Sequence, residues 1–166
     1  MKNSTQILPA QPHEGNLFLC QVAEVKLSYS SRIKASDRYQ ISSSRQAEEL
    51  LRNSWDHSTI EHVETIKLIL INRSNRVLGM ATLSTGGTAG CLVDAKTVFQ
   101  YALKANASSI ILCHNHPSGN PRPSQADLDI SRKIRDGGKL LDITLLDHLI
   151  LTPWDGYYSM ADEGVL

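Results

Sequence analysis

The sequence predicts an α/β (α+β) fold in which helices pack on a single mixed β-sheet. At 166 residues, with 41% apolar and 20% charged residues, the chain has the size and composition of one domain that buries a full-sized core. Short β-rich runs alternate along it with segments whose apolar residues recur at helical spacing, which is typical of layered folds of helices and strands. No stretch repeats at a fixed period, so a solenoid or a propeller is excluded.

Charge and cysteine usage narrow the function classes. The 17 basic and 17 acidic side chains give a formal net charge of zero, so the chain lacks the overall basic character typical of nucleic-acid-binding proteins. Its cysteines, Cys20, Cys91 and Cys113, are odd in number and widely separated, which favours reduced thiols. No apolar run approaches the roughly 18 residues of a membrane span. We therefore expect a cytoplasmic protein without membrane contact.

The first third of the chain predicts a flexible lead and an extension. Residues 1–18 are polar and contain proline, which is typical of a flexible N-terminal lead. Residues 19–62 form a predicted strand-helix extension, in which 21–29 alternates well enough for a strand. A helix is expected to begin at Ser42 to Ser44 and to end near Trp55.

The middle of the chain predicts a hairpin followed by a helix. Two β-rich runs, residues 66–71 and 77–83, flank the turn "NRSN". Asp94 is a suitable N-cap for an amphipathic helix that reaches about residue 106.

The last third predicts two long strands around a helix. "SSIILC" is continuously apolar, as expected of a strand buried on both faces, and it ends at His114. Ser124 opens a helix that Gly137 and Gly138 are expected to stop. "DITLLDHLILT" is a long strand, parallel or antiparallel to its neighbour, and "GYYSM" predicts a short one.

Two histidines and an aspartate form a pattern suited to catalytic zinc, which takes three protein ligands and leaves a position open for water. His114 and His116 stand two apart in an extended segment, so the period of two in a strand sends both side chains to the same side. Asp127 lies three residues after Ser124, in the first turn of the predicted helix, and points back toward the histidines. Its negative charge offsets the helix dipole, which disfavours a cation at that end.

Hydrolysis also needs a base that takes a proton from a metal-bound water. Glu64 and Glu61 both precede the strand of residues 66–71, and composition does not choose between them. Ser124 can donate to a developing oxyanion or serve only as an N-cap. Asp127 has an alternative as well, as the acidic member of a capping-box-like first turn.

These residues resemble the JAMM (MPN-plus) metalloprotease family. The pattern His114-x-His116, seven residues, Ser124, two residues, Asp127 is similar to the family's metal motif. "HNHPSG" and "PSQAD" are similar to its RadC branch in particular. The likeness covers residues 63–166 and includes "LINRSNRVLG", "NASSIILCHNHPSG" and "LLDHLILT".

The resemblance implies a JAMM/MPN-like metal-binding domain over residues 63–166, with cytidine-deaminase-like layering. It implies one zinc ion per chain, with His114, His116 and Asp127 as the ligands. In this family a glutamate opens the first long strand, and "ETIKLILIN" aligns Glu64 with it as the general base and acid. The same resemblance implies Ser124 as an oxyanion stabiliser.

Partners are less constrained than the site. Longer members of the RadC branch place a helix-hairpin-helix DNA-binding segment before this domain, whereas residues 1–63 here contain one glycine, Gly15, and no such hairpin. Members that cut ubiquitin carry extra loops for that partner. This sequence shows no such insertion. The expected partner is a protein or peptide substrate, and a homo-oligomer stays open. A local patch for DNA remains an alternative, formed by Arg122, Arg132, Lys133 and Arg135.

Three function hypotheses follow. The first is a zinc-dependent hydrolase of the metallopeptidase or isopeptidase type, in which Glu64 activates a metal-bound water. The second is a DNA-repair-associated or assembly module whose metal site is structural or vestigial. A ferrous oxygenase would also use two histidines and a carboxylate, but the alternation of helices and strands counts against it.

Three further features receive structural interpretations. His148 is expected to bond the neighbouring carboxylate of Asp147, with an outer role at the metal site as the alternative. Cys113 is interpreted as a small buried apolar residue. Gly86 and Gly87 are interpreted as a turn, because the lysine of a phosphate-binding loop is lacking.

Overall fold

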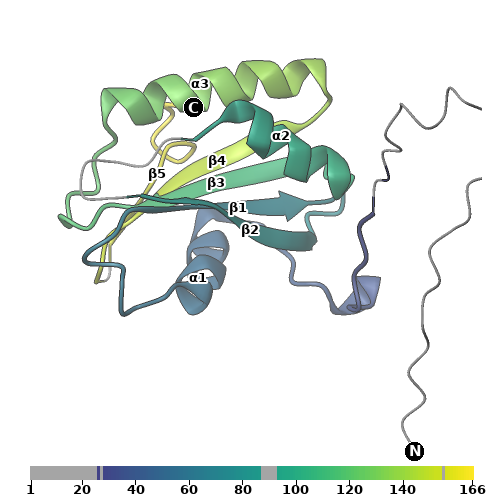
Figure 1. Ribbon diagram of the computed structural model, residues 1–166, viewed down its shortest axis with the longest axis horizontal. Coiled ribbons are helices and arrows are strands. Elements are labelled where there is room, and N and C mark those ends of the chain that lie inside the picture. Colours follow the sequence, from purple (N-terminus) through teal and green to yellow (C-terminus); the bar gives the residue numbers. More distant parts are fainter. Residues whose placement is uncertain (1–25, 27, 87–92, 155) are drawn as a thin grey trace, which may run out of the picture.

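A five-stranded mixed sheet forms the centre of the computed structural model, which describes residues 26, 28–86, 93–154 and 156–166. The strands follow the order β2-β1-β3-β4-β5 (Figure 1). Neighbouring pairs are antiparallel except β3 and β4, which are parallel. The strands are β1 (Thr65–Ile71), β2 (Val77–Thr85), β3 (Ser109–Asn115), β4 (Thr144–Leu151) and β5 (Tyr157–Ser159).

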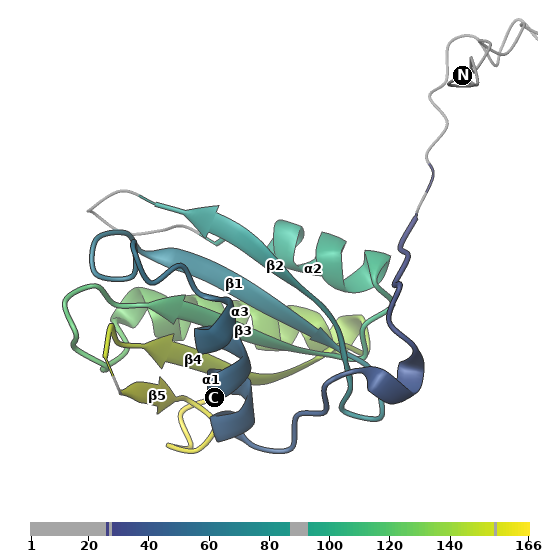
Figure 2. The ribbon, with the colours of Figure 1, turned by 90° about the horizontal axis from the view of Figure 1, so that it is seen from below.

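Helices cover both faces of this sheet. Helices α2 (Ala95–Lys104) and α3 (Gln125–Leu140) lie on one face, and α1 (Ser44–Ser54) lies on the other (Figures 1 and 2). One turn of 3₁₀ helix, Ala35–Asp37, precedes α1. Among the described residues no helix combines the length and the apolarity needed to cross a membrane. The expected α/β architecture with a mixed sheet is confirmed.

The alternation of side chains along the strands divides the core into two layers. On the side of α2 and α3, Leu68, Leu112 and Ile134 are fully buried. On the side of α1, Ile69 and Leu149 pack with residues of α1. All seven residues of β1 are buried, because helices cover both its faces.

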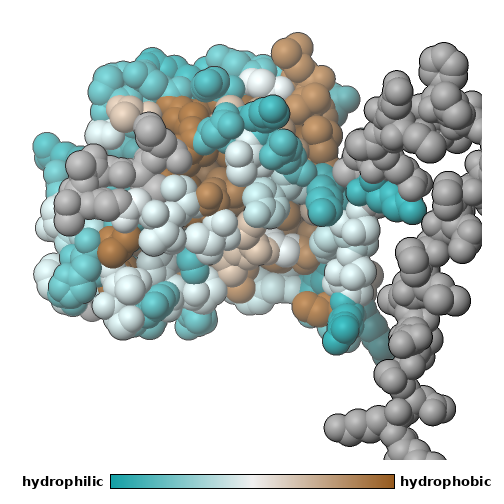
Figure 3. Space-filling view, viewed as in Figure 1, coloured by the Kyte–Doolittle hydropathy of each residue, from teal (hydrophilic) through white to brown (hydrophobic). Residues whose placement is uncertain are grey.

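Part of the apolar surface that remains lies at the ends of helices. Apolar residues show among polar ones near the C-terminal ends of α2 and α3 (Figure 3). Leu140 is 88% exposed and Leu103 is 56% exposed. Scattered exposed apolar side chains of this kind are common on folded proteins.

The predicted hairpin and helix starts are confirmed. β1 and β2 pair antiparallel across the turn at residues 72–76. The side chains of Ser43, Asp94 and Ser124 each accept a hydrogen bond from the first turn of the helix that follows. The sequence predicts these helix starts because a capping side chain bonds a backbone N–H only two or three residues away.

The prediction that Gly137 and Gly138 stop the third helix is wrong. α3 continues through both glycines to Leu140, and Asp142 takes the left-handed turn beyond it with φ 54°. A Cβ on Gly138 would lie 2.2 Å from the carbonyl oxygen of Ile143, and one on Gly137 would lie 2.9 Å from the Phe99 ring. These glycines therefore permit close packing and do not end the helix.

Several expectations fall partly or wholly outside the described residues. The flexible lead at residues 1–18 lies outside them, as do Cys20, Gly87 and Cys91. Of the strand expected at 21–29, only Lys26, Ser28 and Tyr29 are described, and they belong to no helix or strand.

Candidate metal centre

Three residues from two elements bring their ligand atoms together. His114 lies at the end of β3, His116 follows that strand, and Asp127 lies in the first turn of α3. One potential ligand atom from each residue lies within 4.8 Å of the other two. The Nε2 atoms of His114 and His116 are 2.9 Å apart, and Asp127 Oδ1 lies 3.3 Å from His114 Nε2. The set was predicted from spacing, and the structure brings its members together.

The outer nitrogen of His116 has a fixed partner. His116 Nδ1 lies 2.7 Å from the backbone carbonyl of Asn120, which can only accept a hydrogen bond. Nδ1 therefore carries the proton of the neutral ring. This leaves Nε2 with a lone pair that points toward His114.

A chain of hydrogen bonds fixes the tautomer of His114 in the same way. The Ser131 hydroxyl donates to the backbone carbonyl of Asp127 at 2.6 Å, so it accepts from His148 Nδ1, also at 2.6 Å. His148 Nε2 then accepts from His114 Nδ1 at 2.8 Å. His114 is left with its lone pair on Nε2, where the other two ligand atoms lie.

The expectation that His148 bonds the carboxylate of Asp147 through its ring is wrong. Only the backbone N–H of His148 donates to Asp147 Oδ1, while the ring lies between His114 and Ser131. Along a strand, adjacent side chains point to opposite faces, so neighbours in sequence cannot meet here. The alternative, an outer role at the candidate metal site, matches the contact of the His148 ring with His114.

Asp127 combines two interactions that the sequence left as alternatives. Its Oδ2 accepts from the backbone N–H of Ser124 at 2.7 Å and from the Ser124 hydroxyl at 2.6 Å, which forms a capping box. Its Oδ1 faces His114. One carboxylate can thus cap α3 and serve as a metal ligand, because it has an oxygen for each.

Proton affinities at the cluster reflect this closeness. Burial opposes ionisation of Asp127, but hydrogen bonding to the His114 and His116 rings in their protonated form outweighs it and holds the pKa of Asp127 well below its usual range. The same carboxylate raises the pKa of His116. Burial lowers the pKa of His148 well below its usual value, which keeps that ring neutral within the hydrogen-bond chain.

The donor set fits a zinc ion. Two ring nitrogens whose lone pairs face one another at 2.9 Å repel unless a cation lies between them, either a proton or a metal ion. A neighbouring carboxylate anion strengthens the attraction for that cation. Two neutral imidazoles and one carboxylate are a ligand set of catalytic zinc, and each histidine also has the outer hydrogen bond typical of such sites.

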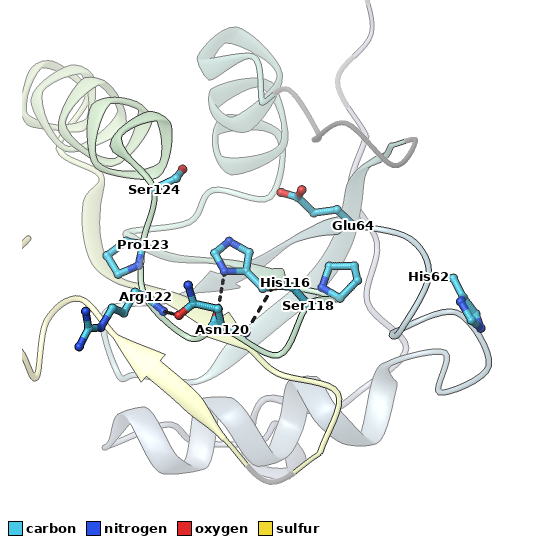
Figure 4. A pocket seen from close by; sticks show the side chains of 9 residues that line it. His62, Glu64, His116, Ser118, Asn120, Arg122, Pro123 and Ser124 are labelled. Carbon is cyan, nitrogen blue, oxygen red and sulfur yellow. Dashed lines mark hydrogen bonds between the residues drawn. The ribbon is translucent and has the colours of Figure 1, made fainter.

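Glu64 lies in the same cavity as His116. The antiparallel register pairs Ile66 with His114, so continuing it by two residues places Glu64 beside His116. In Figure 4 the Glu64 carboxylate points into the cavity that His116 and Ser124 also line, whereas His62 lies apart. The cavity has a volume of about 530 Å³. Glu61, the other candidate base, does not line it.

A second hollow adjoins the cluster. Its volume is about 350 Å³, and Ile66, Val93 and Ile130 supply apolar walls. His114, Asp127 and His148 line it as well. The cluster therefore borders two hollows, of which the second has the more apolar walls.

Two site residues were missed or undervalued from the sequence. No local sequence pattern indicates Ser131, because its partner His148 lies 17 residues away in the sequence. Asn115, between the two histidines, is fully buried and bonds the segment before β1. The available indication in the sequence was an asparagine between the two candidate ligands in "HNH". Cys113 is buried, as predicted, and burial raises the pKa of its thiol.

Comparison with protein families gives one match over most of the chain. The model for the RadC-like JAB domain matches residues 41–165. This range includes the three clustered residues, Glu64 and Ser124.

Relatives with the name "UPF0758 protein" match a large part of this chain. The protein of Flavobacterium johnsoniae is 49% identical over 102 residues, which are 61% of this chain and 44% of the relative. That of Clostridium kluyveri is 37% identical over 146 residues, 87% of this chain and 61% of the relative. That of Thermotoga maritima is 39% identical over 103 residues, 62% of this chain and 46% of the relative. The chain thus spans about half the length of the curated relatives it matches.

Proposed function

This chain belongs to the family of RadC-like JAB domains, and from that premise we propose that it is a zinc-dependent hydrolase of the metallopeptidase or isopeptidase type. One observation carries the proposal. His114 Nε2, His116 Nε2 and an Asp127 oxygen converge beside a cavity that Glu64 lines. Such a set of ligands with an adjacent carboxylate suits hydrolysis of an amide bond.

The three clustered residues would hold the ion, one per chain. When bound, zinc supplies a lowered pKa for a water molecule and polarises the carbonyl of the substrate. His116 and His114 would be held in ligand geometry by Asn120 and His148. Asp127 would contribute negative charge while it continues to cap α3.

Glu64 is the proposed general base and acid. Its carboxylate would take a proton from the attacking water as the new carbon–oxygen bond forms. It would then pass that proton to the amide nitrogen as the carbon–nitrogen bond breaks. One carboxylate at the edge of the cavity can carry out both proton transfers, because the attacking oxygen and the leaving nitrogen bond to the same carbon atom.

Ser124 is the proposed donor to the oxyanion. It lines the cavity with Glu64 and His116. Its hydroxyl donates to Asp127 Oδ2 at 2.6 Å, so it would have to turn toward the substrate to act. The proposed contribution of Ser124 is therefore smaller than that of Glu64.

No specific observation favours the DNA-associated alternative. Arg132 pairs with Asp129, and Arg135 pairs with Asp136, which reduces the positive charge of the patch. The chain as a whole is neutral. DNA and oligomeric partners remain predictions.

The test is zinc titration of the purified protein under reducing conditions, together with His116→Ala and Glu64→Gln. We expect about one zinc per chain for the wild type and for Glu64→Gln. His116→Ala should lose more affinity than the about 10- to 100-fold expected when an outer partner of a ligand is lost. Zinc-dependent cleavage of a quenched-peptide library should persist in the wild type and be lost in both variants.

Matched controls come from the same part of the chain. His62→Ala removes a histidine that lines the same cavity but lies apart from the cluster, and Glu61→Gln removes the rejected base. Both should bind zinc and cleave as the wild type does. A wild type that binds no zinc, or a Glu64→Gln variant that cleaves at the normal rate, would contradict the proposal.

A further inference from the structure

Asn115 lies between the two proposed histidine ligands and is fully buried. Its side chain makes three hydrogen bonds, two to the segment that precedes β1 and one to Thr65, the first residue of β1. The amide nitrogen donates to the carbonyls of Ile60 at 2.7 Å and Val63 at 3.0 Å. The amide oxygen accepts from the backbone N–H of Thr65 at 2.8 Å.

These bonds enclose Glu64. The Val63 carbonyl belongs to the peptide group before Glu64, and the Thr65 N–H belongs to the peptide group after it. The carbonyl of Glu64 itself accepts from the Gly86 N–H at 2.9 Å. With both flanking peptide groups held, the Cα of Glu64 and the direction of its side chain are set by Asn115.

We propose that Asn115 is a positioning residue that holds Glu64 over the pair of histidine ligands. This inference rests on the proposed function, since it assigns Asn115 a role in placing the general base. It goes beyond that function, because the proposed ligands and the proposed base do not include Asn115.

The geometry of β3 links the position of Glu64 directly to the positions of the two histidines. Alternation along an extended chain turns His114 and His116 to one side and Asn115 to the other. Three consecutive residues thus carry two ligands and the support of the base. A displacement of this tripeptide would move ligands and base together, so the distance between them is preserved.

Only an amide has the donors and the acceptor that this position requires. The side chain must donate twice and accept once, which matches the NH₂ group and the oxygen of asparagine. Aspartate has nearly the same shape, but it would place a negative oxygen against the carbonyls of Ile60 and Val63. Burial makes that repulsion costly, because water cannot intervene.

Asn72 offers a matched control at the opposite end of β1. Its side-chain oxygen accepts from the N–H groups of Ser74 and Arg76 in the hairpin turn. An acceptor role is compatible with aspartate. The same substitution is therefore expected to be tolerated at Asn72 and disruptive at Asn115.

The test compares Asn115→Asp and the milder Asn115→Ser with Asn72→Asp, each in the full chain. Zinc stoichiometry should stay near one per chain in all of them, and zinc affinity should change less than about threefold. Amide hydrogen exchange at Thr65 and Gly86 should accelerate at least about tenfold in the Asn115 variants and stay unchanged in Asn72→Asp. On a peptide that the wild type cleaves, kcat should fall at least about tenfold with little change in KM.

The outcomes separate this inference from the proposed function. If no peptide is cleaved by the wild type, the proposed hydrolase fails, while hydrogen exchange still tests whether Asn115 holds the segment. If the Asn115 variants lose zinc affinity in proportion to kcat, or lose stability without a selective change at Thr65 and Gly86, Asn115 is only structural and the inference is overturned. Unchanged kcat in a folded Asn115→Ser variant would also overturn it.

Discussion

The tautomer of His114 depends on residues distant from it in the sequence. Ser131 can accept from His148 because its own proton is directed to the carbonyl of Asp127. The chain ends at His114 Nδ1, which donates to His148. Each hydrogen bond in this chain has one direction, so a change at Ser131 alters the tautomer of His114, the proposed ligand.

We predict that Ser131→Ala lowers zinc affinity about 10-fold, the low end of the range for loss of an outer partner, because Ser131 acts on His114 through His148. Without the serine oxygen, the proton on His148 Nδ1 has no acceptor and the other tautomer becomes favourable. Zinc titration against a competing chelator measures the change.

Ser159→Ala is the matched control for this prediction. Ser159 is also buried, but its hydroxyl donates to Asp147 and has no contact with the hydrogen-bond chain. Both variants should lose about 1–2 kcal/mol of unfolding free energy. Equal zinc affinities in the two variants would refute the role of Ser131.

At the scale of elements, α3 depends on two glycines in its last turns. Gly138 lies against the carbonyl of Ile143, at the point where the chain leaves the helix for β4. The N–H groups of Leu141 and Ile143 both donate to the Gly138 carbonyl. The glycine thus allows helix and following strand to approach closely.

We predict that Gly138→Ala destabilises the protein by about 1–2 kcal/mol, which is the cost of overpacking less the gain in helix propensity. The added methyl group would lie 2.2 Å from a backbone oxygen, and this overpacking outweighs the gain in helix propensity of about 1 kcal/mol. Gly79→Ala in β2 is the control, since a Cβ there meets nothing within 4 Å. Urea unfolding measures both, and a Gly138→Ala variant as stable as Gly79→Ala would contradict the packing argument.

At the scale of the whole molecule, α1 covers one face of the sheet. Leu51 and Trp55 pack against Ile69 and Leu149. The expected division of the chain at residue 63, between an extension and a metal-binding domain, remains a prediction. Its test is whether residues 63–166 fold by themselves.

We predict that residues 63–166 do not fold alone, whereas residues 39–166 do. Without α1 the sheet would expose at least five large apolar side chains, each worth about 1.5–3 kcal/mol when buried, against a typical total stability of about 5–15 kcal/mol. The longer piece keeps the bond from the Val77 N–H to the Tyr39 carbonyl. Circular dichroism and thermal melting compare the two pieces, and a cooperative melt of residues 63–166 would support the division at 63.

The sequence alone predicted the mixed sheet, the hairpin, the helix starts and the clustered residues. These depend on local rules: alternation along strands, capping side chains, and a motif whose spacing is fixed by one strand and one helical turn. His114, His116 and Asp127 are near enough in sequence for such rules to bring them together.

Only the tertiary structure decided which distant groups complete the site. The parallel pairing of β3 with β4 brings His148 to His114, although the sequence suggested its neighbour Asp147 as partner. Antiparallel pairing with β1 places Glu64 beside His116 and excludes Glu61 from the cavity. The close approach of Ile143 to α3 makes Gly138 a packing residue, whereas the sequence indicated a helix end there. Register and close approach arise between elements, so no local pattern specifies them.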